Sequence, residues 1–204
     1  MRVPGDPPTH KGLPVLIFRT GADFETWLSA QPPEAPGAWL KFAKKNGGAE
    51  ATLGKPDAID AALCHGWIDG QIDRFDDAHW LIRFTPRRPK SRWSEVNRQR
   101  ATELMAEGRV HPAGRAAIEA ARADGRWEAA YAPASRADIP DDLRAALAAN
   151  PEAEAFFNTL RGANRYAFLY RLGAVKRAET RAKKLVGFVE MLARGETLHG
   201  KKGD

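Results

Sequence analysis

The segments Trp67-Ile-Asp-Gly-Gln-Ile72 and Trp80-Leu-Ile-Arg-Phe84 decide the fold of this chain. Both are rich in the aromatic and β-branched residues that are typical of strands, and the polar connector between them centres on residues 76–77. We therefore expect an antiparallel hairpin. Apolar runs at residues 13–18 and 38–43 predict two more strands, so the N-terminal part is expected to contain a small antiparallel sheet.

Most of the remaining chain carries helix signals that are punctuated by proline and glycine. Thr20 or Asp23 can cap the first helix, Ser94 is a typical N-cap residue, and Pro56 has the position of a first-turn proline. The expected helical stretches are residues 20–28, 56–65, 95–107, 112–124, 140–149 and 151–160, with a long basic stretch over 164–194. The predicted fold class is α+β, with a small antiparallel sheet and helices in the N-terminal part and an all-helical C-terminal part.

The expected domain organisation follows from the distribution of proline and glycine. Residues 1–12 are predicted to be a flexible tail, because they contain three prolines and two glycines. Residues 13–132 are expected to form the α+β domain, and residues 133–200 the helical C-terminal region. The segment 131–140, with two prolines and alternating charges, is the predicted linker.

Length and composition describe an ordinary globular protein. The chain has 204 residues, of which 43% are hydrophobic and 28% are charged. A single cysteine, Cys64, excludes an intrachain disulfide and favours a reducing compartment. No apolar run approaches the roughly 18 residues of a membrane span, so we expect a cytoplasmic protein without a transmembrane segment.

The net charge of +6 is distributed in blocks of opposite sign. Residues 57–77 hold six acids and one base, whereas residues 83–100, called here the first basic segment, hold seven bases and one acid. Residues 161–204 hold eleven bases and four acids. Such blocks indicate either a surface that binds an anion or segments that neutralise one another on folding.

The first basic segment is the main candidate for a binding site. Prolines keep its first half out of helix and sheet, and arginine, lysine, serine and the start of a helix are good anion ligands. The candidate anion-binding residues here are Arg87, Arg88, Lys90, Ser91, Arg92, Trp93 and Ser94. In the alternative interpretation, Trp93 anchors the helix start in the core while the arginines pair with the acids of residues 69–77.

The second basic segment, Ala174-Val-Lys-Arg-Ala-Glu-Thr-Arg-Ala-Lys-Lys184, is predicted to be helical. Its candidate anion-binding residues are Lys176, Arg177 and Arg181. A solvated helix face opposite the apolar stripe of Leu185, Phe188 and Leu192 explains the same pattern equally well.

The sequence predicts no catalytic residue, no metal site and no cofactor. Adjacent Cys64 and His65 would point about 100° apart on a helix, so they are not placed as a nucleophile and its base. The five histidines show none of the spacings of zinc motifs, and the glycines form no phosphate-binding loop. Cys64 is expected to be a small core residue, and Asp69 a residue at a turn or strand end.

Three stretches resemble the bacterial YdeI/OmpD-associated family, whose members are also labelled bacteriocin-protection proteins. They are Ala62-Leu-Cys-His-Gly-Trp-Ile-Asp-Gly70, Phe84-Thr-Pro-Arg-Arg-Pro-Lys-Ser-Arg-Trp-Ser-Glu-Val-Asn97 and residues 174–184. The resemblance covers roughly residues 24–196. It departs from the family pattern at His65, where an aromatic such as Phe is usual. The family names imply a role in stress or envelope protection against antimicrobial peptides or bacteriocins, and they supply no reaction and no functional residue.

Three functions are compatible with these features. The first is a non-enzymatic protein that binds an anionic partner, which is a nucleic acid, an acidic protein or a phosphorylated metabolite. The second is an enzyme that acts on a phosphorylated or carboxylated small molecule, held by Arg87, Arg88, Lys90 and Arg92, with Asp69 or His65 as base. The third is a helical module that binds a protein partner through Leu185, Phe188 and Leu192. The oligomeric state is not specified by the sequence.

Overall fold

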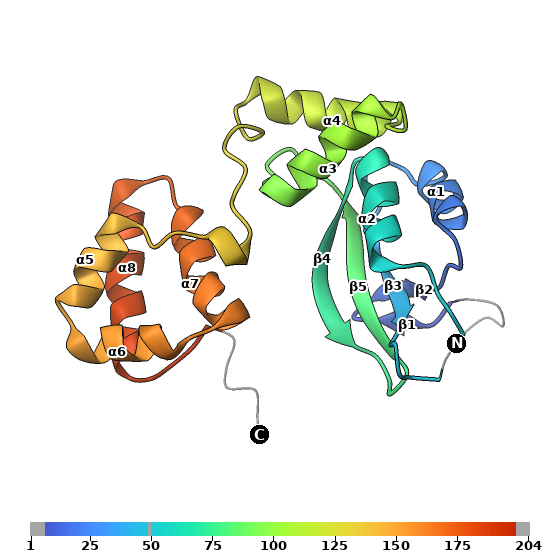
Figure 1. Ribbon diagram of the computed structural model, residues 1–204. Helices are drawn as coiled ribbons and strands as arrows, with labels where there is room; N and C mark the ends of the chain where they lie inside the picture. The colour runs from blue at the N-terminus through green and yellow to red at the C-terminus, as the bar shows by residue number, and fades with distance from the viewer. Residues whose placement is uncertain (1–6, 49, 199–204) are drawn as a thin grey trace. The chain divides into compact units, whose positions relative to one another are not determined.

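The computed structural model describes residues 7–48 and 50–198. Eight α-helices, five strands and one short 3₁₀ helix are present in this part of the chain (Figure 1). The chain divides into two compact units, residues 1–130 and 131–204. The first unit contains the whole sheet and helices α1–α4, and the second unit contains helices only, so the predicted α+β class is confirmed.

The sheet of the first unit has the strand order β1-β2-β3-β5-β4. Its strands are β1 (Thr9–His10), β2 (Leu13–Leu16), β3 (Ala38–Ala43), β4 (Trp67–Arg74) and β5 (His79–Pro86). The predicted hairpin is the pair β4 and β5, and β3 also pairs with β5 in antiparallel orientation. Strands β2 and β3 are parallel, so the sheet is mixed, and the expectation of a purely antiparallel sheet is wrong for this pair.

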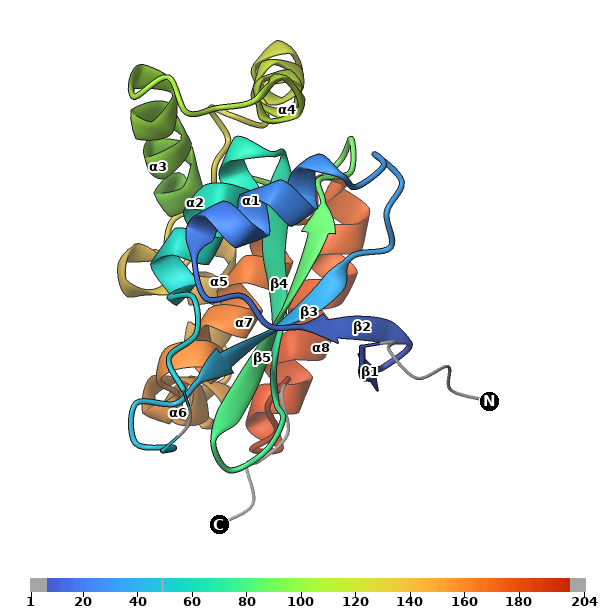
Figure 2. The ribbon, with the colours of Figure 1, turned by 90° about the vertical axis from the view of Figure 1, so that its right-hand side faces the viewer.

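Helices α1 (Gly21–Ser29) and α2 (Lys55–Cys64) cover one face of this sheet, and in Figure 2 they lie in front of it. Of the two cap candidates Thr20 and Asp23, Thr20 caps α1, and its side chain accepts a hydrogen bond from the backbone N–H of Asp23. Helix α2 presents three alanines, Ala58, Ala61 and Ala62, to the strands. Because alanine is small, α2 can lie close to the large side chains of β3 and β5.

Helices α3 (Glu95–Ala106) and α4 (Pro112–Ala123) complete the first unit around the C-terminal end of α2. Two glycines allow this contact. A Cβ atom on Gly114 would lie 2.2 Å from the carbonyl oxygen of Cys64, and one on Gly66, which has a φ of 74°, would lie 2.8 Å from the carbonyl oxygen of Ala113. No other residue type fits at such distances, so the end of α2 and the start of α4 are in backbone contact.

The second unit packs its helices around its own apolar core. It contains η1 (Ala134–Arg136), α5 (Asp141–Ala148), α6 (Pro151–Thr159), α7 (Gly162–Gly173) and α8 (Ala178–Ala193). Phe188 and Leu192, 6% and 0% exposed, belong to this core, and Leu185 packs against it. The predicted apolar stripe therefore holds α8 to its neighbours, and the hypothesis of a partner-binding stripe is wrong for these residues.

Two further expectations differ from the structure. Residues 1–6 of the predicted tail lie outside the described residues, but Thr9 and His10 form β1 and pair with β2, because Lys11 and Gly12 make the tight turn between them. The long basic stretch is two helices, since residues 174–177 connect α7 to α8. The boundary between the compact units lies two residues before the end of the predicted α+β domain.

Candidate functional site

Residues 83–86 of the first basic segment belong to β5, although the prolines were expected to keep this part out of the sheet, and residues 87–93 leave the strand as a loop that is held at both ends. The backbone N–H of Arg87 donates to the carbonyl of Gly66 at 2.9 Å. Within the loop, the N–H of Arg88 donates to Ser91 Oγ at 3.0 Å. Arg126 holds the far end by donating from Nη1 to the carbonyl of Ser91 at 2.8 Å. Ser94 is the N-cap of α3, as predicted, and accepts from the N–H of Asn97.

Trp93 fixes this loop to the interior. It is 1% exposed, and its ring lies 4.8 Å from that of Trp127 in an edge-to-face contact. The guanidinium of Arg87 lies 3.5 Å above the same ring. A ring this deeply buried offers no exposed face to a ligand, so the contacts of Trp93 match its alternative role as a core anchor. Ser91 and Ser94 likewise make local hydrogen bonds that hold the loop and cap the helix.

Beside the loop lies a groove of about 290 Å³ at the end of the β4–β5 hairpin. We call it the arginine groove, and its lining residues are Gly70, Gln71, Arg83, Thr85 and Arg88. The pairing of β4 with β5 is irregular between Asp69 and Ile72. Such a bulge interrupts the regular ladder and re-aims side chains at the strand edge. Among the described residues, no carboxylate lines this groove.

The guanidinium of Arg83 has an unmet hydrogen-bonding requirement. Its Nε is buried and has no hydrogen-bond partner among the residues that the structure describes. A buried donor without a partner costs about 1–3 kcal/mol. Arg88, by contrast, is exposed and reaches the groove from the loop. The two guanidinium groups, the Thr85 hydroxyl and the Gln71 amide together provide several donors for one anion.

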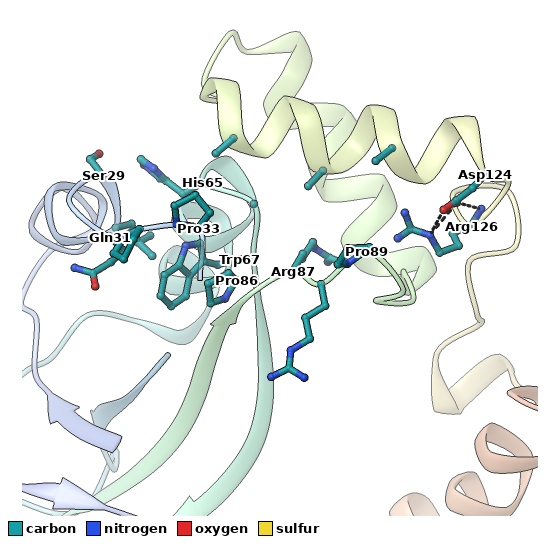
Figure 3. Close-up of a pocket in the computed structure, with 17 residues that line it drawn as sticks. Ser29, Gln31, Pro33, His65, Trp67, Pro86, Arg87, Pro89, Asp124 and Arg126 are labelled. Carbon is teal, nitrogen blue, oxygen red and sulfur yellow. Dashed lines mark hydrogen bonds and ion pairs between the residues drawn. The ribbon is translucent and has the colours of Figure 1, made fainter. Parts of the chain in front are cut away.

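A larger cleft of about 460 Å³ lies on the other side of the loop (Figure 3). Pro33, His65 and Trp67 lie together at one side, and the Asp124–Arg126 ion pair lies at the other. Most of the remaining lining is proline, alanine and leucine. Arg87 and Arg88 line this cleft as well, so Arg88 is shared between the cleft and the arginine groove.

The residues at the end of α2 are buried beside this cleft. Cys64 is fully buried, as predicted, and burial raises the pKa of its thiol to about 11. A thiol with this pKa is protonated at neutral pH and is a poor nucleophile. His65 is 7% exposed, and its pKa is lowered by burial first and by neighbouring His111 second. Neither residue is arranged as part of a nucleophile–base pair.

Three of the four acids of residues 69–77 have partners other than the loop arginines. Asp73 accepts from Lys11 at 2.6 Å and contacts His10 at 2.9 Å. The hydrogen bond from Lys11 first, and that from His10 second, lower the pKa of the Asp73 carboxyl to about 2. Asp76 contacts His79. Asp77 accepts from Arg74. The interpretation in which these acids neutralise residues 87–92 is therefore wrong for Asp73, Asp76 and Asp77.

The second basic segment has structural partners inside its own unit. Arg181 donates from Nε and Nη2 to the two carboxylate oxygens of Asp142, at 2.6 and 2.9 Å, and from Nη1 to the carbonyl of Leu172. It therefore joins α8 to α5 and α7. Lys176 and Arg177 precede α8, in the connection from α7. Arg181, predicted as an anion ligand, has its guanidinium occupied by these contacts.

The sequence reasoning missed two groups of residues. Arg83, Thr85 and Gln71 were hidden within strands, where alternation alone did not distinguish a groove from a solvated face. Glu25 and His111, which lie near His65, were missed because they are far apart in the sequence.

Comparison with known proteins divides the chain in a similar way. Residues 16–117 match a family model described as a domain of unknown function, DUF8412. Residues 136–195 match the family model described as bacteriocin-protection, YdeI or OmpD-associated, so the resemblance to that family is confirmed for this part. The motifs at 62–70 and 84–97 lie in the first match and not in the second. No significant match was found among curated proteins or among solved structures. Among the described residues, no helix is long and apolar enough to cross a membrane.

Proposed function

We propose that this chain binds a phosphate-bearing ligand in the arginine groove. The chain belongs to the DUF8412 domain family, whose model matches residues 16–117. Residues 136–195 match the YdeI/OmpD-associated family model. One observation carries the proposal. Arg83 and Arg88 converge with Thr85 and Gln71 on a groove that no described carboxylate lines. Guanidinium groups bind phosphate oxygens through paired hydrogen bonds, and nearby hydroxyl and amide donors add to this binding.

The larger cleft gives this ligand a place for its organic part. Arg88 lines both cavities, so a ligand whose phosphate this arginine binds can reach the cleft that Pro86 and Trp67 line. Ligand sites of this kind combine a mostly apolar lining with a few polar groups that fix orientation. The function supported best is therefore binding of a phosphorylated molecule.

The test compares Arg88→Ala with Arg74→Ala, which removes the same charge from the opposite end of the same hairpin. Arg74 is exposed and pairs only with Asp77 among the described residues. Binding of a fluorescent mononucleotide and of a single-stranded oligonucleotide is measured at about 50 and 200 mM salt. A hydrogen bond to a charged group contributes about 1.5–3 kcal/mol, so Arg88→Ala should weaken binding by roughly tenfold or more. Arg74→Ala should leave the affinity nearly unchanged.

Thr85→Val is the second variant, because it removes a donor while keeping the shape of the side chain. It should also weaken binding without lowering the melting temperature. The slope of log affinity against log salt concentration counts the phosphates that the protein contacts. A slope that corresponds to one contact identifies a single phosphate, whereas a slope that grows by about 0.7 per additional phosphate identifies a single-stranded nucleic acid. Equal affinities for Arg88→Ala and Arg74→Ala, or no binding of either probe at the lower salt, would contradict the proposal.

A further inference from the structure

Glu25, His65 and His111 meet at one point of the first unit although they are far apart in the sequence. Glu25 lies on α1, His65 is the C-cap of α2, and His111 is the N-cap of α4. One ligand atom from each residue lies within 4.8 Å of those of the other two. The two imidazole rings are stacked, with their centroids 4.1 Å apart and their planes 23° from parallel.

Backbone contacts hold the two histidines in this arrangement. The N–H of His111 donates to the carbonyl of Cys64 at 3.0 Å, which places His111 beside the residue that follows Cys64. Gly114 then allows α4 to touch the same carbonyl. Because these contacts are between main-chain atoms, the approach of His65 to His111 is a property of the fold and does not depend on flexible side chains.

The imidazole of His65 has an unmet hydrogen-bonding requirement. His65 is 7% exposed, and its Nε2 is buried without a hydrogen-bond partner among residues 7–48 and 50–198. Buried polar atoms in folded proteins nearly always have a partner. An unpartnered imidazole nitrogen next to a second imidazole and a carboxylate therefore points to a bound species for which all three groups can be ligands.

We propose that Glu25, His65 and His111 bind a divalent transition-metal ion, for which Zn²⁺ is the natural probe. Two histidines and one carboxylate are a common ligand set for zinc and for non-haem iron. At metal–ligand distances of about 2.0–2.2 Å, two ligands of a tetrahedral site lie about 3.3–3.6 Å apart. The observed separations, all within 4.8 Å, exceed this spacing by at most about 1.2–1.5 Å. His111 is exposed and Glu25 is half-buried, so rotation of these two side chains brings the atoms to that spacing.

The surroundings determine how open this site is. His65 also lines the larger cleft, so a metal held by three protein ligands has its remaining position next to that cavity. Arg109 is the competing group, because its Nη2 lies 3.6 Å from a carboxylate oxygen of Glu25. Arg109 also lies 3.4 Å from Glu107 and 3.8 Å from Asp60, which can keep the guanidinium when Glu25 turns to the metal. The site is separate from the arginine groove and stands independently of the proposed function.

The test is a titration of the full chain, without phosphate, with Zn²⁺ and with Co²⁺, whose visible absorption reports coordination number. We expect one ion per chain. Removing partners that only orient a ligand already costs about 10–100-fold in metal affinity, so His111→Ala and Glu25→Gln should each lose at least about 100-fold. His111 is exposed and makes no side-chain cap bond, so its replacement leaves the fold intact. The matched control is His79→Ala, which removes a histidine that pairs with Asp76 elsewhere in the unit.

Two more variants make the result decisive. Arg109→Gln removes the competing cation and should tighten metal binding, a gain that a general loss of structure cannot produce. Cys64→Ala should leave the Co²⁺ spectrum unchanged and without a thiolate charge-transfer band, because the thiol is not part of the ligand set. The proposal is overturned if the wild-type chain binds no ion at micromolar Zn²⁺, or if His111→Ala binds as tightly as His79→Ala.

Discussion

The two basic segments have similar charge density in the sequence but different surroundings in the structure. In the second segment, Arg181 is bound by both oxygens of Asp142, and Lys183 pairs with Glu179 one helical turn away. In the first, Arg83 and Arg88 face a groove that no described carboxylate lines, while the nearby acid Asp73 is taken by Lys11 and His10. The difference teaches that the number of bases does not identify an anion site. An anion site is indicated where the fold leaves neighbouring bases without an acid to pair with.

The cores of the two units explain this difference. The second unit is held together by helix packing alone, so a charge pair between α5 and α8 adds to an interface that already exists. The first unit has a sheet, and the loop that leaves β5 is held by a few specific bonds and by the buried Trp93, while residues 88–90 are exposed. Sites that bind ligands are commonly found on such loops, whereas bases on a packed helix are usually satisfied locally.

The largest expected effect tests whether the first segment depends on a buried anchor. Trp93→Ala removes a fully buried ring and its contact with Trp127, so it should lower the free energy of unfolding by about 3–5 kcal/mol. Chemical denaturation measures this change. Val96→Ala, in the first turn of the following helix α3, is the control, since Val96 is 55% exposed and should change stability by less than about 0.5 kcal/mol. An unchanged melting temperature in Trp93→Ala would mean that the ring is not a core residue.

A glycine in each unit gives the next largest contrast. Gly114→Ala places a Cβ 2.2 Å from the carbonyl of Cys64, and this overpacking should cost about 1–3 kcal/mol as α4 moves away from α2. Gly187→Ala, in the interior of α8, meets nothing within 4 Å and should stabilise its helix by up to about 1 kcal/mol. Thermal unfolding distinguishes the two signs. A stabilised Gly114→Ala variant would show that the α2–α4 contact is not needed.

Local signals in the sequence predicted much of the fold. Thr20 and Ser94 are the caps of α1 and α3, and the hairpin turns at its acidic connector. These features succeed because capping and turn formation depend on neighbouring residues. Strand β1 was missed because two residues are too few to show a period.

The candidate sites were harder to predict because their residues are joined only by tertiary structure. Arg88 was identified from its position in a proline-stiffened loop, but Arg83 and Thr85 required the register of β5 against β4. His65 and His111 are brought together by glycine contacts between two helices, and spacing rules apply only to ligands on one element. The acid that binds Arg181 lies on another helix and gave no signal in the sequence either.

Arg181→Ala and Arg88→Ala should give opposite results in two measurements. Loss of the ion pair with Asp142, whose two side chains are 27% and 39% exposed, should destabilise the second unit by about 1 kcal/mol. Hydrogen exchange of the α5 and α8 amides measures this change, and affinity for the phosphate probe should not alter. Arg88→Ala should leave this exchange unchanged and weaken phosphate binding. If Arg181→Ala weakened phosphate binding as much as Arg88→Ala, the division between the two segments would be wrong.

The smallest expected effect concerns Asp73, the acid that Lys11 and His10 bind in place of the loop arginines. Lys11 and then His10 lower the pKa of Asp73 from 3.8 to about 2. A lowered pKa in the folded state means that this contribution to stability is complete above about pH 5 and is lost as the pH falls through 4 toward 2. Because Lys11 is 62% exposed, screening should keep the contribution below about 1 kcal/mol. Carboxyl chemical shifts measured against pH give the pKa directly. Lys11→Ala should raise it toward the ordinary value, and Arg88→Ala should leave it unchanged. A shift in the Arg88→Ala titration would show that Asp73 neutralises the loop after all, because the pKa of a carboxyl responds to whichever base is its real partner.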